Sequence, residues 1–492
     1  MLKILLWLLP LGGYAQISTS QWRPVFHFTP ERNWTNDPNG LLFLDGVYHL
    51  YNQQNPFGNE WGHMSWGHAR STDLVHWHHL PLALPEKVAG DDTTWRFSGC
   101  AVYDAENTSG LCDGGKGCIV AVYTADQPHQ HRESQYVAYS NDGGLTLTDY
   151  AKDPVIDLHL KDFRDPNVSW NAALRRWLMV VSMVDQHKVR FYSSPNLIAW
   201  TLLSEFGPAG YTGQPWECPA FFRLPVQGRP GVWKWVLTVS AWGPSGAPMV
   251  QYFIGDFDGK MFTSTRQDVL DYGNTLYASI PWNGLPAGKC TYIGWLVPEP
   301  RPTWPWRGAM SIPRDLSLRV TPGGIVLCQE PAALIKKAIP PGAVRALTAP
   351  QALPRTLERA TANAYWIHAT LHLGTAVRVG FHVALDSATG EQTTIGYDKV
   401  TGTVYVDRSH GDTTGLRAGK LFQSMPVTLK EGVLDLEILL DKSILEVFAG
   451  HGEKVLTTLI FPGKDAGGIS AFADGGTARL DHYEIRDLNN LP

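Results

Sequence analysis

A strand–turn–strand unit recurs through the first two thirds of the chain and restricts the fold more than any other feature. Its polar turns are marked by Ser71, Ser140, Ser194, Asp256 and Ser311. Successive markers are 69, 54, 62 and 55 residues apart, which leaves room for one four-stranded sheet each. Any large β-protein contains hairpins, but evenly repeated four-stranded units are typical of blades around a central channel. Five copies predict a five-bladed β-propeller.

The character of the sequence changes after about Gln329. A short helix is predicted at 330–338, and the segment that follows is rich in Pro and Ala. Strands with alternating polarity then resume, which is typical of a β-sandwich. We therefore predict an all-β chain, with a five-bladed β-propeller at 21–335, a linker at 336–356 and a C-terminal β-sandwich at 357–492.

Composition narrows the classes of function. The chain has 492 residues, 44% hydrophobic and 18% charged, with a net charge of −5. It shows no basic block or stripe, so no nucleic-acid partner is expected. There are 19 Trp, 18 Tyr and 18 Phe residues. This aromatic content suits either a large β core or the stacking of aromatic rings on sugars.

The N-terminus predicts export. Residues 1–15 read as a signal peptide, with Lys3 before a short apolar run at 4–11 and a plausible cleavage site after Ala15. That run is too short to span a bilayer, so we expect a secreted or periplasmic protein without a membrane anchor. Cys112 and Cys118 bracket a flexible loop and are either a small disulfide or two free thiols.

Three acids lie in unusual turn contexts near strand ends, namely Asp37 in "NDPNG", Asp165 in "FRDPN" and Glu217 in "WECPA". Each alone is more often structural, since Asp-Pro is a common turn. Glycoside hydrolysis, however, uses two carboxyl groups on either side of the scissile bond. The amide groups around Asp37 favour an ionised nucleophile, and the apolar neighbours of Glu217 favour a protonated acid.

The motifs "NWTNDPNG", "FRDP" and "WECP", in this order, resemble the signature motifs of glycoside hydrolase family 32, the invertases, inulinases and levanases. Segments such as "SILEVFAG" extend the resemblance into the second domain. It implies a propeller with the active site in its central funnel, followed by a sandwich. It also implies Asp37 as nucleophile, Glu217 as acid/base and Asp165 as stabiliser of the transition state, with no cofactor.

The same resemblance implies further pocket residues around the terminal fructosyl unit: Asn36, Gln53, Trp61, Ser98, Arg164 and Trp295. Two departures concern the pocket. Thr35 stands where members of the family usually have Met, and the segment 293–308 is short and Pro-rich. Trp295 and Trp304 are both candidates for the leaving-group side of the pocket.

Metal sites are not expected. His76 and His78 share a strand face, but no Cys or acid completes a ligand set, and the acidic turn 255–259 fits a blade hairpin. The main hypothesis is therefore an exo-acting retaining β-fructosidase that removes terminal fructosyl units from fructans such as inulin or levan, or from sucrose. The alternatives are a fructosyltransferase or endo-fructanase of the same family, and a non-catalytic carbohydrate-binding propeller. The sequence does not indicate the oligomeric state.

Overall fold

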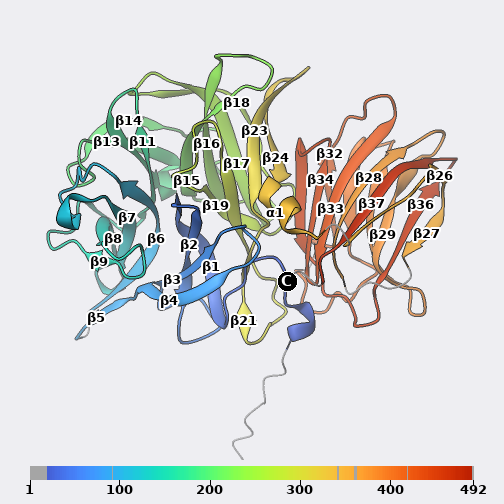
Figure 1. Ribbon diagram of the computed structural model, residues 1–492, viewed down its shortest axis with the longest axis horizontal. Coiled ribbons are helices and arrows are strands. Elements are labelled where there is room, and N and C mark those ends of the chain that lie inside the picture. Colours follow the sequence, from blue (N-terminus) through green and yellow to red (C-terminus); the bar gives the residue numbers. More distant parts are fainter. Residues whose placement is uncertain (1–18, 91, 341–342, 359–362, 418, 490–492) are drawn as a thin grey trace, which may run out of the picture.

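The computed structural model describes residues 19–90, 92–340, 343–358, 363–417 and 419–489. Two β units lie side by side, a propeller and a sandwich (Figure 1). The predicted signal peptide at 1–15 lies outside the described residues. The predicted fold, a five-bladed β-propeller followed by a β-sandwich, is confirmed.

The first two blades are built from the N-terminal half of the propeller sequence. Blade I has the order β21-β1-β2-β3-β4, with β1 (Asn33–Leu44), β2 (Val47–Asn55), β3 (Ser65–Ser71), β4 (His78–Leu84) and β21 (Trp306–Arg307). Blade II has the order β10-β8-β7-β6-β5, and β9 pairs with β8. Its strands are β5 (Lys87–Ala89), β6 (Asp92–Asp104), β7 (Cys118–Gln127), β8 (Arg132–Ser140), β9 (Thr148–Asp149) and β10 (Ile156–Leu160). Strand β21 comes from the end of the propeller and so closes the ring onto blade I.

The remaining blades follow in chain order. Blade III contains β11 (Phe163–Asn171), β12 (Arg176–Met183), β13 (Lys188–Ser194) and β14 (Thr201–Phe206). Blade IV contains β15 (Glu217–Pro225), β16 (Trp233–Trp242), β17 (Pro248–Phe257) and β18 (Phe262–Val269). Blade V contains β19 (Leu276–Pro281), β20 (Thr291–Leu296), β22 (Ala309–Met310), β23 (Arg314–Thr321) and β24 (Gly324–Pro331). Short 3₁₀ turns occur at η1 (Ser20–Trp22), η2 (Asp113–Gly115), η3 (Pro128–Gln130) and η4 (Val184–Gln186).

The repeated turn has a common structure in the first three blades. Strand β3 ends at Ser71, β8 at Ser140 and β13 at Ser194. The hydroxyl group of each serine accepts a hydrogen bond from a backbone N–H of the turn that follows. In blade IV, Asp256 lies near the end of β17. The fifth marker differs, because Ser311 precedes β23 and bonds Gly294 of the neighbouring strand. The number of blades is therefore as predicted, although the last repeat is out of register.

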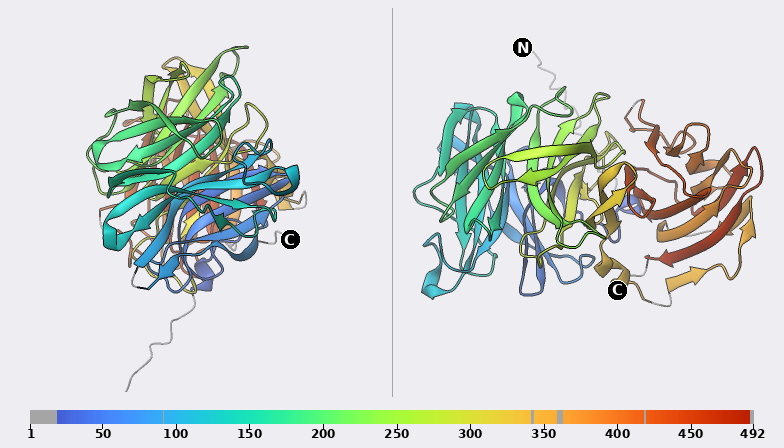
Figure 2. Two further views of the ribbon diagram at one scale, coloured as in Figure 1. Left: turned by 90° about the vertical axis from the view of Figure 1, so that its left-hand side faces the viewer. Right: turned by 90° about the horizontal axis from the view of Figure 1, so that it is seen from above.

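The C-terminal unit is a sandwich of two antiparallel sheets. One sheet has the order β25-β37-β28-β33-β34-β35, and β26 also pairs with β37. Its strands are β25 (Val344–Ala346), β26 (Gln351–Ala352), β28 (Ala364–His372), β33 (Val433–Asp441), β34 (Ile444–Ala449), β35 (Lys454–Leu459) and β37 (Arg479–Asp487). The other has the order β27-β36-β29-β30-β31-β32, with β27 (Arg355–Glu358), β29 (Arg378–Asp386), β30 (Glu391–Asp398), β31 (Thr403–Asp407), β32 (Phe422–Pro426) and β36 (Gly468–Asp474). Figure 2 shows the two sheets packed face to face beside the propeller.

The segment predicted as a linker, 336–356, contains part of the sandwich sheet. Helix α1 (Ala333–Ala338) lies within the predicted helix at 330–338. It is followed by β25 and β26, which both pair with β37. The Pro- and Ala-rich composition did not predict these short edge strands. They form because their backbone groups pair with a strand of the sheet that they join. The boundaries of the two domains stay predictions.

A buried charge network joins the two units. The guanidinium of Arg314 on β23 contacts Glu446 on β34 at 3.0 Å and Asp271 at 3.1 Å. His27 lies between Asp441 and Glu446, with Nδ1 2.8 Å from Asp441 Oδ2 and Nε2 3.3 Å from Glu446 Oε1. All of these side chains are buried. The domains are therefore connected through desolvated ion pairs, for which the loss of one partner is costly.

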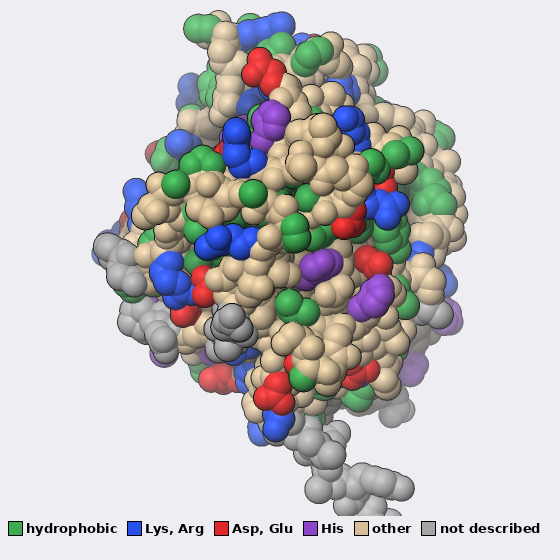
Figure 3. Space-filling view, turned by 90° about the vertical axis from the view of Figure 1, so that its right-hand side faces the viewer, with side chains coloured by type: hydrophobic (Ala, Val, Ile, Leu, Met, Phe, Trp, Pro, Cys, Tyr) green, Lys and Arg blue, Asp and Glu red, His purple; other side chains and the backbone are tan. Residues whose placement is uncertain are grey.

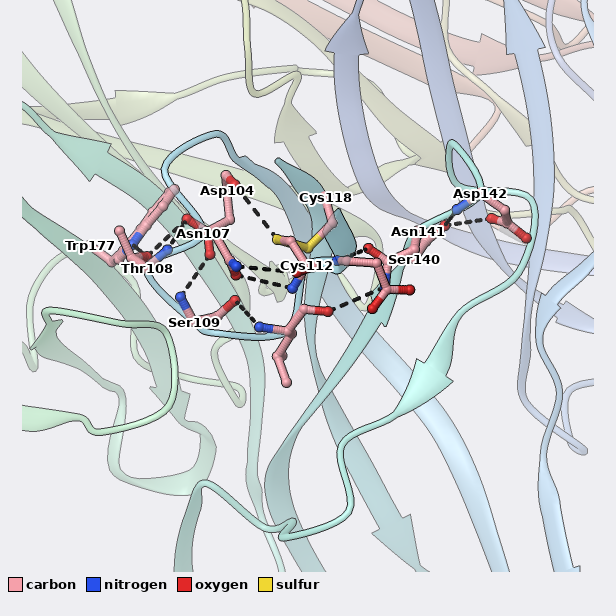
Figure 4. Close-up of a disulfide and its surroundings, with 12 residues drawn as sticks. Asp104, Asn107, Thr108, Ser109, Cys112, Cys118, Ser140, Asn141, Asp142 and Trp177 are labelled. Carbon is pink, nitrogen blue, oxygen red and sulfur yellow. Dashed lines mark hydrogen bonds between the residues drawn. A yellow bond between two sulfur atoms is a disulfide. The ribbon is translucent and has the colours of Figure 1, made fainter. Parts of the chain in front are cut away.

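Cys112 and Cys118 form a disulfide that closes the loop between β6 and β7 (Figure 4). Asn107 supports the loop, since its side chain bonds the backbone N–H and C=O of Cys112. The Trp177 indole of blade III donates to Thr108 Oγ1 at 3.0 Å. The loop thus also holds two blades together. Of the alternatives left by the sequence, the structure shows the bonded one.

The outer end of the sandwich carries basic and acidic side chains mixed over one face (Figure 3). Mixed charge of this kind does not give the single-sign surface that a polyanion needs. Among the helices of the described ranges, none has the length and apolar character required to cross a membrane.

Candidate active site

The innermost strands of the five blades share one irregularity at the same level of the funnel. The antiparallel pairing shifts register at Thr35/Pro38 in β1, Arg96/Gly99 in β6, Arg164/Asn167 in β11, Glu217/Ala220 in β15 and Tyr277/Ile280 in β19. These five strands contact one another in a closed ring. A β-bulge bends a strand and redirects the side chain at that point. Five bulges at one level therefore turn side chains from five blades toward a common space.

That space is a cavity of about 550 Å³. All of the site residues predicted from the sequence line it: Asn36, Asp37, Gln53, Trp61, Ser98, Arg164, Asp165, Glu217 and Trp295. These residues come from different parts of the chain, so the fold brings together groups as far apart in sequence as Asn36 and Trp295. The sequence-based site is thus collected in a single cavity.

Asp37 is placed by the bulge of β1, directly before Pro38. Its Oδ2 accepts a hydrogen bond from the Ser98 hydroxyl at 2.6 Å. Burial raises the pKa of Asp37 and the nearby charge of Glu217 adds to this, while the hydrogen bonds from Ser98, Asn36 and Cys218 lower it. The net direction is upward. The hydrogen bond from Asn36 favours the ionised carboxylate, as expected from the sequence, and burial opposes it.

Asp165 is held in the left-handed region of backbone conformation, with φ of 66°. Its Oδ2 accepts the backbone N–H of Cys218 at 2.8 Å, and its own N–H donates to Thr124 Oγ1 at 3.0 Å. Burial raises the pKa of Asp165 to about 7, even though Arg164 opposes the shift. The thiol of Cys218 lies 3.5 Å from both Asp165 Oδ2 and Asp37 Oδ2, so it bridges the two carboxyl groups.

Glu217 begins β15 and has two polar partners. Arg164 Nε donates to its Oε1 at 3.1 Å, and the Tyr277 hydroxyl donates to its Oε2 at 2.5 Å. The apolar setting expected from its sequence neighbours is wrong. The ring of Trp216 points into the core against Phe253, and its indole N–H bonds the Tyr211 carbonyl. Trp216 lies directly before β15 and points away from the cavity, which Glu217 and Cys218 both line.

The upper wall of the cavity is aromatic. Trp61 is 53% exposed at the rim and packs edge-on against Trp95, with ring centroids 5.2 Å apart. Gln53 lies deeper, where its amide donates to the Arg96 carbonyl at 2.7 Å. Trp295 lines the cavity and Trp304 does not. Of the two Trp candidates in the segment 293–308, Trp295 is thus the one that faces the site.

Sequence reasoning missed several polar residues of the site, of which Tyr277 and Glu133 contact predicted site residues. Tyr277 contacts Glu217, and Glu133 contacts Arg164 at 2.5 Å. Tyr277 lies in "DYGNTLYAS", which carried a family resemblance but no chemical signal of its own. Glu133 lies in "HRESQYVAYS", which reads as an ordinary strand. Within the part of the chain that the structure describes, no group of three His, Cys, Asp or Glu side chains is arranged to hold a metal ion.

Comparison with known proteins assigns the family. Residues 27–331 match the glycosyl hydrolases family 32 N-terminal domain, and residues 341–487 match the family 32 C-terminal domain. The chain is 39% identical to a levanase of Bacillus subtilis, with 96% of this chain and 71% of the levanase covered. It is 37% identical to an extracellular exo-inulinase of Aspergillus awamori, with 97% of both chains covered.

Solved structures agree with this assignment. The crystal structure of the exo-inulinase from Aspergillus awamori matches with a TM-score of 0.87 and 36% identity, covering 95% of this chain and 99% of that one. A fructofuranosidase of Schwanniomyces occidentalis complexed with fructose matches with a TM-score of 0.85 and 28% identity, covering 96% and 99%. The whole described architecture is shared, both units included. The chain belongs to glycosyl hydrolase family 32.

Proposed function

We propose that this protein is a retaining, exo-acting β-fructosidase that hydrolyses terminal β-D-fructofuranosyl units of fructans such as inulin or levan, and of sucrose. The observation that carries the proposal is the meeting of Asp37, Asp165 and Glu217 in one cavity. The levanase and exo-inulinase relatives support fructan as the substrate class. Burying three acids in one cavity costs free energy. Sugar binding alone does not require this arrangement, whereas glycoside hydrolysis does.

In the proposed reaction, a carboxylate oxygen of Asp37 attacks the anomeric C2 of the terminal fructosyl unit. Glu217 gives its proton to the glycosidic oxygen as the C2–O bond breaks, and the shortened chain departs. Glu217 then takes a proton from water, which attacks C2 and releases fructose from Asp37. This is the double displacement of retaining glycosidases.

Asp165 is proposed to accept hydrogen bonds from fructose hydroxyl groups and to stabilise positive charge on the ring in the transition state. Preorganised charge in a desolvated site is worth more than it would be in water. Asp165 is well placed for this role because its φ of 66° and the N–H of Cys218 fix the carboxyl group. Asn36, Gln53, Ser98 and Arg164 would complete the pocket, and the exposed ring of Trp61 would stack on the sugar at the rim.

A time course of products from sucrose, inulin and levan, separated by size, tests the proposal. Wild type and Asp37→Asn are compared, because the amide keeps the shape of the side chain and removes the nucleophile. Fructose as the first product from wild type, with none from Asp37→Asn, is the expected result. Early oligosaccharides would instead indicate an endo-fructanase or a transferase, and no product from wild type would indicate a binding protein.

We also propose that the protein acts outside the cytoplasm. Two observations support this. Residues 1–15 have the pattern of a signal peptide, and the Cys112–Cys118 disulfide suits an oxidising compartment. The relative from Aspergillus awamori is extracellular. Fractionation of the native host, with detection of the protein by antibody, tests the location, and recovery in the cytoplasmic fraction would contradict it.

A further inference from the structure

Arg164 is shared between carboxyl groups from different blades. Its Nη1 contacts Glu133 Oε1 on β8 at 2.5 Å and Asp162 Oδ1 at 3.1 Å, while its Nε donates to Glu217 Oε1 at 3.1 Å. The guanidinium is planar and presents its donors in a fixed fork. A change in the position of one end of the group therefore moves the other end. Whatever holds Nη1 also determines where Nε meets Glu217.

Glu133 is the tighter and more deeply buried of the two partners of Nη1. Its side chain is 4% exposed, against 24% for Asp162. Its two oxygens are both in use, since Oε2 accepts the Phe163 N–H at 2.8 Å and Oε1 accepts from Arg164. Glu133 therefore holds the backbone at the start of β11 and the side chain of the next residue together.

Burial raises the pKa of Glu133 to about 8, and the charge of Arg164 opposes this shift. Burial of this carboxyl group costs free energy. Stability alone does not explain its presence, because apolar replacements of buried pairs are often neutral or stabilising. Although Glu133 also borders the cavity, its two occupied oxygens leave it acting through Arg164. The structural consequence of the contact lies at Glu217.

We propose that Glu133 is a positioning residue for the acid/base group. It clamps the Phe163 N–H and the Arg164 guanidinium, and so keeps Arg164 Nε on Oε1 of Glu217 with the carboxyl group directed into the cavity. The inference rests on the proposed acid/base role of Glu217. It assigns to Glu133 an effect on protonation of the leaving group, and no direct contact with the substrate.

The test compares two substrates in each variant. The leaving group of sucrose is glucose, whose oxygen needs protonation, whereas the nitrophenolate of an aryl β-D-fructofuranoside departs with little help. Glu133→Gln keeps the size of the side chain, but it accepts from only one of the two donors and turns its NH₂ toward the other. We expect kcat for sucrose to fall roughly 10–100-fold, as for a misplaced catalytic group. The aryl substrate should lose less than about threefold, and KM should change little.

Asp162→Asn is the matched control, because Asp162 contacts the same Nη1 from a more exposed position. We expect a loss of less than about threefold on both substrates, because an ion pair that is partly open to solvent contributes little and Glu133 still holds Nη1. If Glu133→Gln does not fold, Glu133→Asp replaces it, since this variant keeps the carboxyl group but is too short to reach both donors. Thermal unfolding of each variant establishes that it is folded.

Three outcomes would overturn the inference. Equal losses on the two substrates would indicate a general structural role for Glu133. A raised KM with unchanged kcat would indicate direct substrate binding, and unchanged kinetics would show no role.

Glu217→Gln, measured in parallel, separates this inference from the proposed function. If Glu217→Gln loses more activity on sucrose than on the aryl substrate and Glu133→Gln does not, only the positioning role fails. If Glu217→Gln itself shows no selective loss, the acid assignment fails.

Discussion

The buried imidazole of His27 predicts a loss of stability as the pH rises from 6.5 to 9. Burial by itself would lower the pKa of His27, but hydrogen bonds and charge from Asp441 and Glu446 raise it from 6.5 to about 9. The backbone N–H groups of Val25, Phe26 and His27 also bond Asp441, so the ring is held in place. The protonated ring thus links the chain before β1 to the sandwich.

The sign follows from the two pKa values. The folded chain holds the proton more tightly than the unfolded chain, whose His27 has the ordinary value of 6.5. The contribution is therefore complete below pH 6.5 and disappears as the pH rises through about 9. At 1.36 kcal/mol for each pKa unit, the difference is about 3 kcal/mol. That is a large share of the roughly 5–15 kcal/mol by which domains are usually stable.

The assay is urea unfolding of wild type and His27→Gln at pH 6, 7, 8 and 9, followed by tryptophan fluorescence. Gln donates a hydrogen bond but does not titrate. The free-energy difference between the two proteins should be greatest at pH 6 and should shrink by about 3 kcal/mol by pH 9. Comparison of the two proteins cancels the contributions of Asp165 and Glu133 to the pH dependence of stability, since these groups ionise in the same pH range in both proteins. A difference that stays constant with pH would refute the assignment of a protonated His27.

Three further outcomes are expected. Asp37→Asn should abolish turnover while far-UV circular dichroism stays unchanged, and wild-type activity would contradict the nucleophile role. Glu217→Gln should lower kcat for sucrose by roughly 10²–10⁴-fold, as is typical for general acid catalysis, in a steady-state assay. Cys112→Ser should lower the free energy of unfolding by about 2 kcal/mol, the loop-closure value for a short disulfide loop, with kcat unchanged because the loop lies outside the cavity.

Cys218 is the residue whose interpretation changes most with the structure. An isolated Cys is by default a small, buried hydrophobic residue. In the fold its sulfur lies 3.5 Å from the carboxyl groups of both Asp37 and Asp165, and its φ is 48°. Cys218→Ser keeps a donor in this place, so most activity should remain in the sucrose assay. A total loss would show that the sulfur itself is required.

The fold could be predicted to the level of blades because strands and turns repeat locally. The turn serines show this, since Ser71, Ser140 and Ser194 bond the N–H groups of their own turns. The fifth repeat was misplaced because Ser311 bonds a neighbouring strand instead. The pairing of β25 with β37 was also beyond sequence reasoning, because it joins segments about 140 residues apart. Local signals predict local structure and leave distant pairing undetermined.

The inner-strand bulges explain why some site residues were visible in the sequence and others were not. Pro38, Pro166 and Pro219 follow the three acids by one or two residues, and a Pro inside a strand is found chiefly at edges and bulges. The acids were therefore recognisable by an unusual neighbour.

In the other two inner strands the bulge has a different cause. Gly99 follows Ser98, and a Cβ there would lie 2.2 Å from the Val122 carbonyl oxygen. Ala278 follows Tyr277 and takes φ of 49°, which leaves no mark in the composition. The fold needs a break in every inner strand at this level to turn a side chain into the funnel, and Pro or Gly marks that break in the sequence of four strands but not in β19. Tyr277 therefore becomes a candidate partner of Glu217 only when the register of β19 against β20 is known.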